Sequence, residues 1–165
     1  MRPVISVVGK SKSGKTTLVC KLIRELKSRG YKVSTVKHDV HGFDIDKPGK
    51  DTWKHGEAGA STVVISSPTK MAMIQQLEQE KTLDEILEKI EDADIILTEG
   101  YKREDKPKIE VVKTDRSTKP VCNPSELVAI ASNDKNFEFE KTPVYHWDDA
   151  RGLAKLIEKE FLSNT

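Results

Sequence analysis

A segment near the start of the chain has the residue types and spacing of a phosphate-binding loop. Residues 9–16 read Gly-Lys-Ser-Lys-Ser-Gly-Lys-Thr and fit the pattern G-x-x-x-x-G-K-[ST] at every fixed position. Glycine allows backbone conformations in which successive N–H groups turn towards an anion. Lys15 is then expected to meet the β- and γ-phosphates and Thr16 to offer its hydroxyl to Mg²⁺. The predicted nucleotide-binding residues are Gly9, Lys10, Ser11, Lys12, Ser13, Gly14, Lys15, Thr16 and Thr17.

An acidic residue at the end of a later apolar run is the expected partner of the bound metal. Residues 93–100 read as a buried strand that ends in Glu99 and Gly100. Glu99 would emerge at the C-terminal edge of a parallel sheet beside the phosphate loop, whereas Asp94 would lie at the opposite end. We therefore assign Glu99 to the Mg²⁺ shell through water, and Lys15 and Glu99 as the catalytic pair. An acid that ends a strand by chance is the alternative.

A loop rich in His, Asp and Gly follows the second predicted strand. It occupies residues 37–52 and would leave the same edge of the sheet, so its imidazoles and carboxylates could face the phosphates or the metal. His38, Asp39 and Asp51 are the candidate nucleotide contacts. The alternative is a metal-binding module, because imidazole and carboxylate together suit transition metals. Its ligands would be His38, His41, Asp44 and Asp46.

The remaining elements alternate between strand and helix patterns. Residues 3–8 are a β-branched run, an amphipathic helix should follow the phosphate loop to about Gly30, and residues 32–37 read as a parallel strand. Strand-like runs at 62–66 and 71–75 predict a hairpin that extends a sheet edge and offers a surface to another subunit. Asp148 is expected to cap the last helix.

Asn133 and Asp134 follow a predicted strand at residues 127–131. This position reads the base in many nucleotide-binding folds, but Asn and Asp also favour turns, so base contact and a plain turn stay open. The two residues do not form the Asn-Lys-x-Asp pattern of many GTPases, so they do not select guanine over adenine by sequence alone.

Composition limits the remaining possibilities. A chain of 165 residues suits one domain over 1–165, and the pattern predicts an α/β fold: a P-loop NTPase three-layer sandwich with a mostly parallel sheet and an added antiparallel hairpin. The net charge of +1 argues against nucleic acid as the main partner. No signal peptide or apolar run of roughly 18 residues is evident, so we expect no membrane partner and a cytoplasmic protein. Cys20 and Cys122 indicate neither a disulfide framework nor a four-ligand metal site.

Together these segments resemble a known family, the molybdopterin-guanine dinucleotide biosynthesis adaptor proteins, which are small GTP-binding P-loop NTPases and are usually dimeric. The phosphate loop alone is common to many NTPases, whereas the His/Asp loop and the Glu-Gly-Tyr-Lys segment are more particular. The likeness covers roughly residues 3–131 and rests on residues 9–17, 37–52, 58–60, 97–102 and 107–111.

The resemblance implies GTP and Mg²⁺ as ligands and a role in attaching GMP to molybdopterin. It also implies a homodimer, weak GTPase activity at most, and partners that include the molybdopterin guanylyltransferase and molybdopterin or a molybdoenzyme. One departure is that Lys10 and Lys12 stand where small or polar residues are common in the family. In related dimeric ATPases a lysine at the position of Lys10 reaches the partner's nucleotide, and a solvent-exposed lysine is the alternative.

A small-molecule kinase is the main competing function. It would use the same phosphate loop, but such kinases usually have a mobile lid with several arginines. The chain has six arginines, and none clusters after the phosphate loop or lies in a recognisable arginine-finger motif. The pattern therefore favours slow turnover over rapid hydrolysis or phosphoryl transfer.

Overall fold

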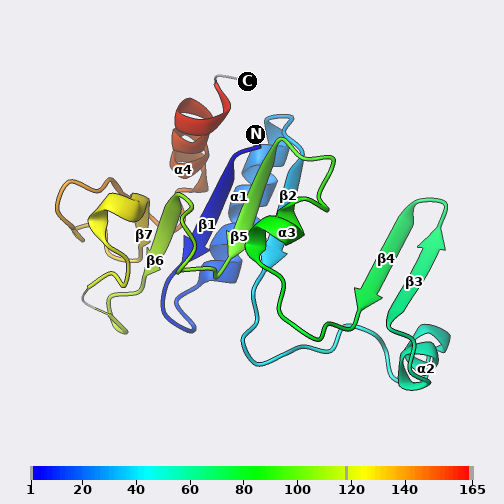
Figure 1. Ribbon diagram of the computed structural model, residues 1–165. Helices are drawn as coiled ribbons and strands as arrows, with labels where there is room; N and C mark the ends of the chain where they lie inside the picture. Colours follow the sequence, from blue (N-terminus) through cyan, green and yellow to red (C-terminus); the bar gives the residue numbers. More distant parts are fainter. Residues whose placement is uncertain (1, 118, 164–165) are drawn as a thin grey trace. The chain divides into compact units, whose positions relative to one another are not determined.

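The computed structural model describes residues 2–117 and 119–163. The chain divides into two compact units, one of residues 1–38 and 88–165 and the other of residues 39–87 (Figure 1). The sequence analysis expected one domain over residues 1–165, and this expectation stays a prediction.

The first unit is built on a six-stranded sheet in which every pairing is parallel. The strand order is β2-β5-β1-β6-β7-β8. The expected fold class, a mostly parallel α/β sheet with an added antiparallel hairpin, is confirmed. The first two strands are parallel as expected, but β5 lies between them (Figure 1). The strands are β1 Val4–Val8, β2 Val33–Lys37, β5 Ile95–Glu99, β6 Lys108–Val112, β7 Leu127–Ser132 and β8 Val144–His146.

Two helices, α1 Lys15–Ser28 and α4 Ala150–Ile157, pack together on one face of this sheet, and a π-helical turn, η2 Glu158–Leu162, continues α4. Leu18, Leu22 and Leu26 lie four apart on α1 and are buried with Leu153 and Ile157 of α4, as helical periodicity requires. Among the described residues, no helix is both long and apolar enough to cross a bilayer.

The cap of α4 corrects one expectation. Asp149, not Asp148, is the N-cap residue, and its carboxylate accepts a hydrogen bond from the N–H of Gly152. Asp148 instead forms an ion pair with Lys21 of α1. Adjacent aspartates both fit the sequence pattern of a cap, and only the backbone conformation decides which of them takes that role.

The second unit contains the predicted hairpin between two short helices. β3 Thr62–Ser67 and β4 Lys70–Gln75 are antiparallel, with Val64 opposite Met73. They form a two-stranded sheet of their own, so the expectation that the hairpin extends an edge of the main sheet is wrong. The helices are α2 Asp51–Glu57 and α3 Leu83–Leu87. Reciprocal hydrogen bonds between Thr82 and Glu85 form a capping box at the start of α3.

Two buried charged side chains hold the loop between β6 and β7. The Lys108 ammonium donates to the Glu126 carboxylate at 2.9 Å, at the end of a 3₁₀ turn, η1 Pro124–Glu126. The Glu110 carboxylate accepts hydrogen bonds from the backbone N–H groups of Val121 at 2.7 Å and Cys122 at 3.0 Å. Buried charges are stable only when they are paired or hydrogen-bonded in this way. The end of the loop is thus fixed to the strand beneath it.

The environment of Cys122 generates a first prediction. Burial, together with the charge of Glu110 and a hydrogen bond to it, raises the pKa of the Cys122 thiol to about 12, whereas Cys20 is exposed. Because the thiolate is the nucleophile, iodoacetamide at pH 8.5 should label Cys20 and leave Cys122 free, as peptide mass spectrometry can measure. Because the pKa is raised in the folded chain, the Cys122 thiol loses its proton at a lower pH in the unfolded chain than in the folded chain. The Cys122 contribution to stability therefore declines as pH rises from about 9.0 towards 12.

A Glu110→Gln variant provides the matched comparison. It removes the negative charge and leaves one oxygen to accept from the two backbone N–H groups, so Cys122 labelling should accelerate by about tenfold. The Cys20 rate should stay constant and serves as the internal control. Equal labelling of both cysteines in the wild-type protein, or no change in the variant, would contradict this account of the loop.

Candidate functional site

The predicted phosphate loop connects the end of β1 to the start of α1. Gly9 has φ of 139°, and a side-chain Cβ there would lie 2.5 Å from the carbonyl oxygen of Val111, so only glycine fits. Gly14 has φ of 102° and is the N-cap residue of α1, and no side chain caps the helix. The first N–H groups of α1 therefore lack intrahelical acceptors and present the positive end of the helix dipole. An anion would be stabilised at this position.

Lys15, the first residue of α1, folds back over the loop. Its ammonium group donates to the carbonyl oxygens of Gly9 at 3.1 Å and Lys10 at 2.8 Å. Partial burial lowers the pKa of Lys15 below its ordinary value, the Glu99 carboxylate acts in the opposite direction, and the charge of Lys37 adds to the lowering. The ammonium is therefore held at the mouth of the loop by carbonyl dipoles that a more strongly negative ligand would replace.

Thr16 and Glu99, the two residues that the sequence analysis assigned to the metal, are in direct contact. The hydroxyl of Thr16 donates to the Glu99 carboxylate at 2.8 Å, across 83 positions of sequence. Glu99 is the last residue of β5, and its side chain is only 13 % exposed. Lys37, at the end of β2, places its ammonium 3.8 Å from the same carboxylate oxygen. The sequence analysis missed Lys37, although its position at the end of a parallel strand already indicated this edge of the sheet.

Ser13 carries a buried hydroxyl that is not satisfied. The residue is 2 % exposed, and its Oγ has no hydrogen-bond partner among the described residues. Such a group is uncommon in a native structure and has a free-energy cost until a partner reaches it. The Ser13 hydroxyl, the uncapped start of α1 and the Lys15 ammonium are all hydrogen-bond donors at this loop. The loop is therefore suited to an anionic ligand.

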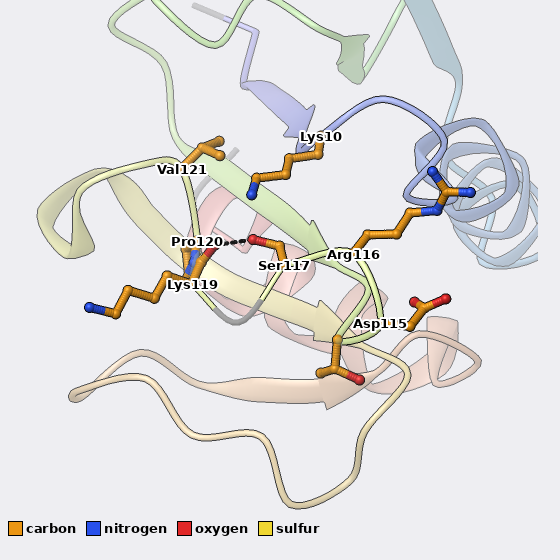
Figure 2. Close-up of a pocket in the computed structure, with 8 residues that line it drawn as sticks. Lys10, Asp115, Arg116, Ser117, Lys119, Pro120 and Val121 are labelled. Atoms are coloured by element: carbon orange, nitrogen blue, oxygen red, sulfur yellow. Dashed lines mark hydrogen bonds between the residues drawn. The ribbon is translucent and has the colours of Figure 1, made fainter.

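The other predicted contacts of the loop are mostly exposed. Ser11, Lys12 and Thr17 are exposed, and Lys12 adopts a left-handed conformation with φ of 58°. The side chain of Lys10 extends instead towards the loop that follows β6 (Figure 2).

His38 follows β2 and belongs to the first unit. Its N–H donates to the carbonyl of Glu99 at 3.0 Å, and its ring stacks on Tyr101 with 4.8 Å between the ring centroids. Tyr101, which has φ of 54°, is a neighbour of the site that the sequence analysis did not select. Gly100 has φ of 97°, which disfavours a side chain, and a Cβ there would also lie 3.3 Å from His38 Cβ.

Asp39 and Asp51 lie in the second unit, where both have local partners. The Asp39 carboxylate accepts from the N–H of His41 at 3.0 Å, and Asp51 begins α2 with its side chain 4.0 Å from the Lys54 ammonium. Their contact with the nucleotide stays a prediction. Among residues 2–117 and 119–163 there is no group of three or more His, Cys, Asp and Glu side chains that could hold a metal ion.

Asn133 and Asp134 follow β7 and have turn-type hydrogen bonds. The Asn133 side-chain oxygen accepts from the N–H of Thr114 at 2.8 Å, and the Asp134 carboxylate accepts from the N–H of Asn136 at 2.9 Å. Asn133 therefore fixes the start of the loop after β6, a positioning role that the sequence analysis did not foresee. Base contact by these two residues stays a prediction.

Comparison with known proteins identifies the family of this chain. Residues 4–133 match the family model described as molybdopterin guanine dinucleotide synthesis protein B. The chain is 35 % identical over 142 residues to a molybdopterin-guanine dinucleotide biosynthesis adapter protein of Haemophilus influenzae, covering 85 % of this chain and 79 % of that protein. It is 34 % identical over 164 residues to the Escherichia coli protein of the same name, covering 95 % and 92 %.

Solved structures agree with the sequence relatives. A crystal structure of molybdopterin-guanine biosynthesis protein B is 30 % identical with a TM-score of 0.72, and the match covers 94 % of this chain and 97 % of that one. The crystal structure of Bacillus subtilis MobB is 25 % identical with a TM-score of 0.75, and the match covers 96 % and 98 %. The match to the family model spans most of the chain and contains both the phosphate loop and Glu99. The chain therefore belongs to the molybdopterin guanine dinucleotide synthesis protein B family.

Proposed function

We propose that this chain binds GTP with Mg²⁺ at the loop of residues 9–17 and acts as an adaptor in the synthesis of molybdopterin guanine dinucleotide. The observation that carries the proposal is the contact between Thr16 and Glu99 at 2.8 Å, beside the uncapped start of α1. The names of the relatives supply the pathway. The resemblance supplies guanine as the base.

The residues present fit a nucleotide and a magnesium ion. Hydroxyl and carboxylate oxygens are the hard ligands that Mg²⁺ prefers, and Thr16 and Glu99 offer one of each, with Glu99 acting through water. The unsatisfied Ser13 hydroxyl and the Lys15 ammonium supply donors for phosphate oxygens. When bound, Mg²⁺ would neutralise phosphate charge. Lys37 would help to orient the Glu99 carboxylate through their ion pair at 3.8 Å.

The remaining contacts complete the proposed nucleotide site. His38, Asp39 and Asp51 would meet the phosphates or the metal-bound water, and Asn133 and Asp134 would meet the base. Lys15 and Glu99 would support no more than slow hydrolysis, because none of the six arginines lies in a recognisable arginine-finger motif. Two of the arginines are engaged elsewhere in the fold: Arg29 pairs with Glu25 and Glu158, and Arg2 donates to the carbonyl of Ile90. In the cytoplasm such an adaptor would serve the guanylyltransferase, with molybdopterin or a molybdoenzyme as a further partner.

The phosphate loop gives the most direct test of nucleotide binding. Lys15→Ala should weaken Mg²⁺–GTP binding by about a hundredfold or more, because it removes a charge-assisted contact at the mouth of the loop. Lys27→Ala is the matched control, since Lys27 is an exposed lysine in the last turn of α1, outside the loop of residues 9–17, and the GTP affinity of this variant should change by less than about threefold. Isothermal titration calorimetry with GTP and ATP measures both effects. Wild-type affinity in the Lys15 variant would refute the proposal.

The hairpin of the second unit supports the proposal of a homodimer. Val64 and Met73 face each other across the two strands and are 50 % and 56 % exposed, and Met71 on β4 is 67 % exposed. An isolated two-stranded sheet is marginally stable in water, and both of its strands are edges that another strand can pair with. A second copy of the chain would cover this apolar surface.

Analytical ultracentrifugation tests the dimer. The wild-type chain should sediment with twice the monomer mass at micromolar concentration, and a Val64→Lys/Met73→Lys variant should sediment as a monomer, because two lysines would be desolvated in the interface. Leu77→Lys is the control: Leu77 is also 50 % exposed but lies outside both strands. A monomeric wild-type chain, or a dimeric double variant, would contradict the hairpin as the dimer contact.

A further inference from the structure

The side chain of Trp147 lies beside the phosphate loop, although no motif in the sequence marks this residue. A Cβ at Gly14 would lie 3.9 Å from Trp147 Cε3 and 4.0 Å from Trp147 Cζ3, which are ordinary van der Waals distances. Gly14 is the N-cap residue of α1 and belongs to the loop of residues 9–17. One edge of the indole ring is therefore next to the start of α1, where the phosphates of a nucleotide would bind.

The backbone of Trp147 is tied to the end of the neighbouring strand. Trp147 directly follows β8, and its N–H donates to the carbonyl of Ser132 at 2.8 Å. Ser132 is the last residue of β7 and directly precedes Asn133. Because β7 and β8 are parallel, both strands end at the sheet edge where ligands of such folds bind. Trp147 is thus linked to the phosphate loop by its ring and to the position before Asn133 by its backbone.

The indole ring is held in place before any nucleotide binds. Trp147 is partly buried and packs against the hydrophobic core of the first unit. The His146 ring meets it edge to face, with 6.4 Å between the ring centroids and 66° between the ring planes. The residues that follow are anchored as well, because Asp148 pairs with Lys21 of α1 and Asp149 caps α4. A ligand that contacts the ring therefore has little side-chain freedom to remove, which lowers the entropic cost of binding.

An indole ring at this position suits a flat aromatic ligand. Because Trp147 is only partly buried, part of its ring stays accessible. Aromatic rings stack on one another with an offset or meet edge to face, and a tryptophan contributes a large apolar area to such a contact. Contact with a nucleic-acid base tolerates different bases, because every base has a π-face. Trp147 therefore adds the apolar surface that the polar side chains of Asn133 and Asp134 lack.

We propose that the indole ring of Trp147 contacts the base of a nucleotide whose phosphates lie on the loop of residues 9–17. The proposal deepens the proposed function and rests on it, because it requires a nucleotide at that loop. It assigns most of the binding energy of the base to an aromatic contact that does not distinguish guanine from adenine. Any preference for one purine then comes from polar groups at the edge of the base, such as Asn133 and Asp134.

Inorganic tripolyphosphate separates the base contact from the phosphate contacts, because it has three linked phosphates and no base. Isothermal titration calorimetry should show that Trp147→Ala weakens Mg²⁺–GTP and Mg²⁺–ATP binding by about tenfold or more, and Mg²⁺–tripolyphosphate binding by less than about threefold. Trp147→Phe keeps an aromatic ring and should restore most of the GTP affinity. Trp53→Ala is the control: it removes the other tryptophan of the chain, partly buried in α2, and should change GTP affinity by less than about threefold.

Tryptophan fluorescence tests the same contact without removing the ring. In Trp53→Phe, Trp147 is the one tryptophan left, and Mg²⁺–GTP should change its emission far more than Mg²⁺–tripolyphosphate does. Three results would overturn the Trp147 contact and leave the phosphate loop intact: unchanged GTP affinity in Trp147→Ala, equal losses of GTP and tripolyphosphate affinity in that variant, or no emission change with GTP. A wild-type chain that binds neither ligand would refute the proposed function, and the Trp147 contact with it.

Discussion

The hydrogen bond from Thr16 to Glu99 is the interaction on which the account of this protein depends. It joins the first turn of α1 to the last residue of β5, two elements that are far apart in the sequence. Its geometry is set by the sheet, because β5 pairs with β1 in a register that places Glu99 beside Val7. The N–H of Gly100 then donates to the carbonyl of Val7 at 3.1 Å, which fixes the strand end next to the phosphate loop.

Most of the charges around this contact are positive. Lys15 and Lys37 lie near one carboxylate, and the start of α1 adds the positive end of a helix dipole. Positive potential therefore exceeds negative potential where phosphates would bind, while Glu99 supplies an acidic oxygen for a cation. This balance is the one that phosphoryl ligands with magnesium require, because the metal and the lysines share the neutralisation of the phosphates.

Local sequence signals predicted the elements that form this site. The glycine spacing, the strand before the loop and the helix after it are contiguous in sequence, and the structure has all three. The hairpin and the position of Glu99 at a strand end were predicted for the same reason. In contrast, the insertion of β5 between β1 and β2 is a long-range pairing that periodicity does not encode. The hairpin was wrongly expected at a sheet edge because strand patterns do not specify which sheet a strand joins.

The sequence did not predict which partners several polar side chains contact in the folded chain. Base contact by Asn133 stays a prediction, and the structure adds a role that the sequence did not indicate, because the Asn133 side-chain oxygen accepts the N–H of Thr114. No motif marked Glu110 and Lys108 as buried, yet both are buried and hold the loop after β6. Arg116 and Lys119 had no motif, and only the folded loop brings them to one pocket with Lys10. Such assignments depend on distances between segments rather than on residue type.

The central claim is that Thr16 and Glu99 form a magnesium-dependent nucleotide site. The most direct measurement is the affinity for GTP with and without Mg²⁺ in the wild-type chain and in Thr16→Val and Glu99→Gln. We predict that Mg²⁺ increases the affinity of the wild-type chain by about tenfold or more and that of either variant by less than about threefold, because each variant loses one oxygen of the site. An equal increase in all three proteins would contradict the account.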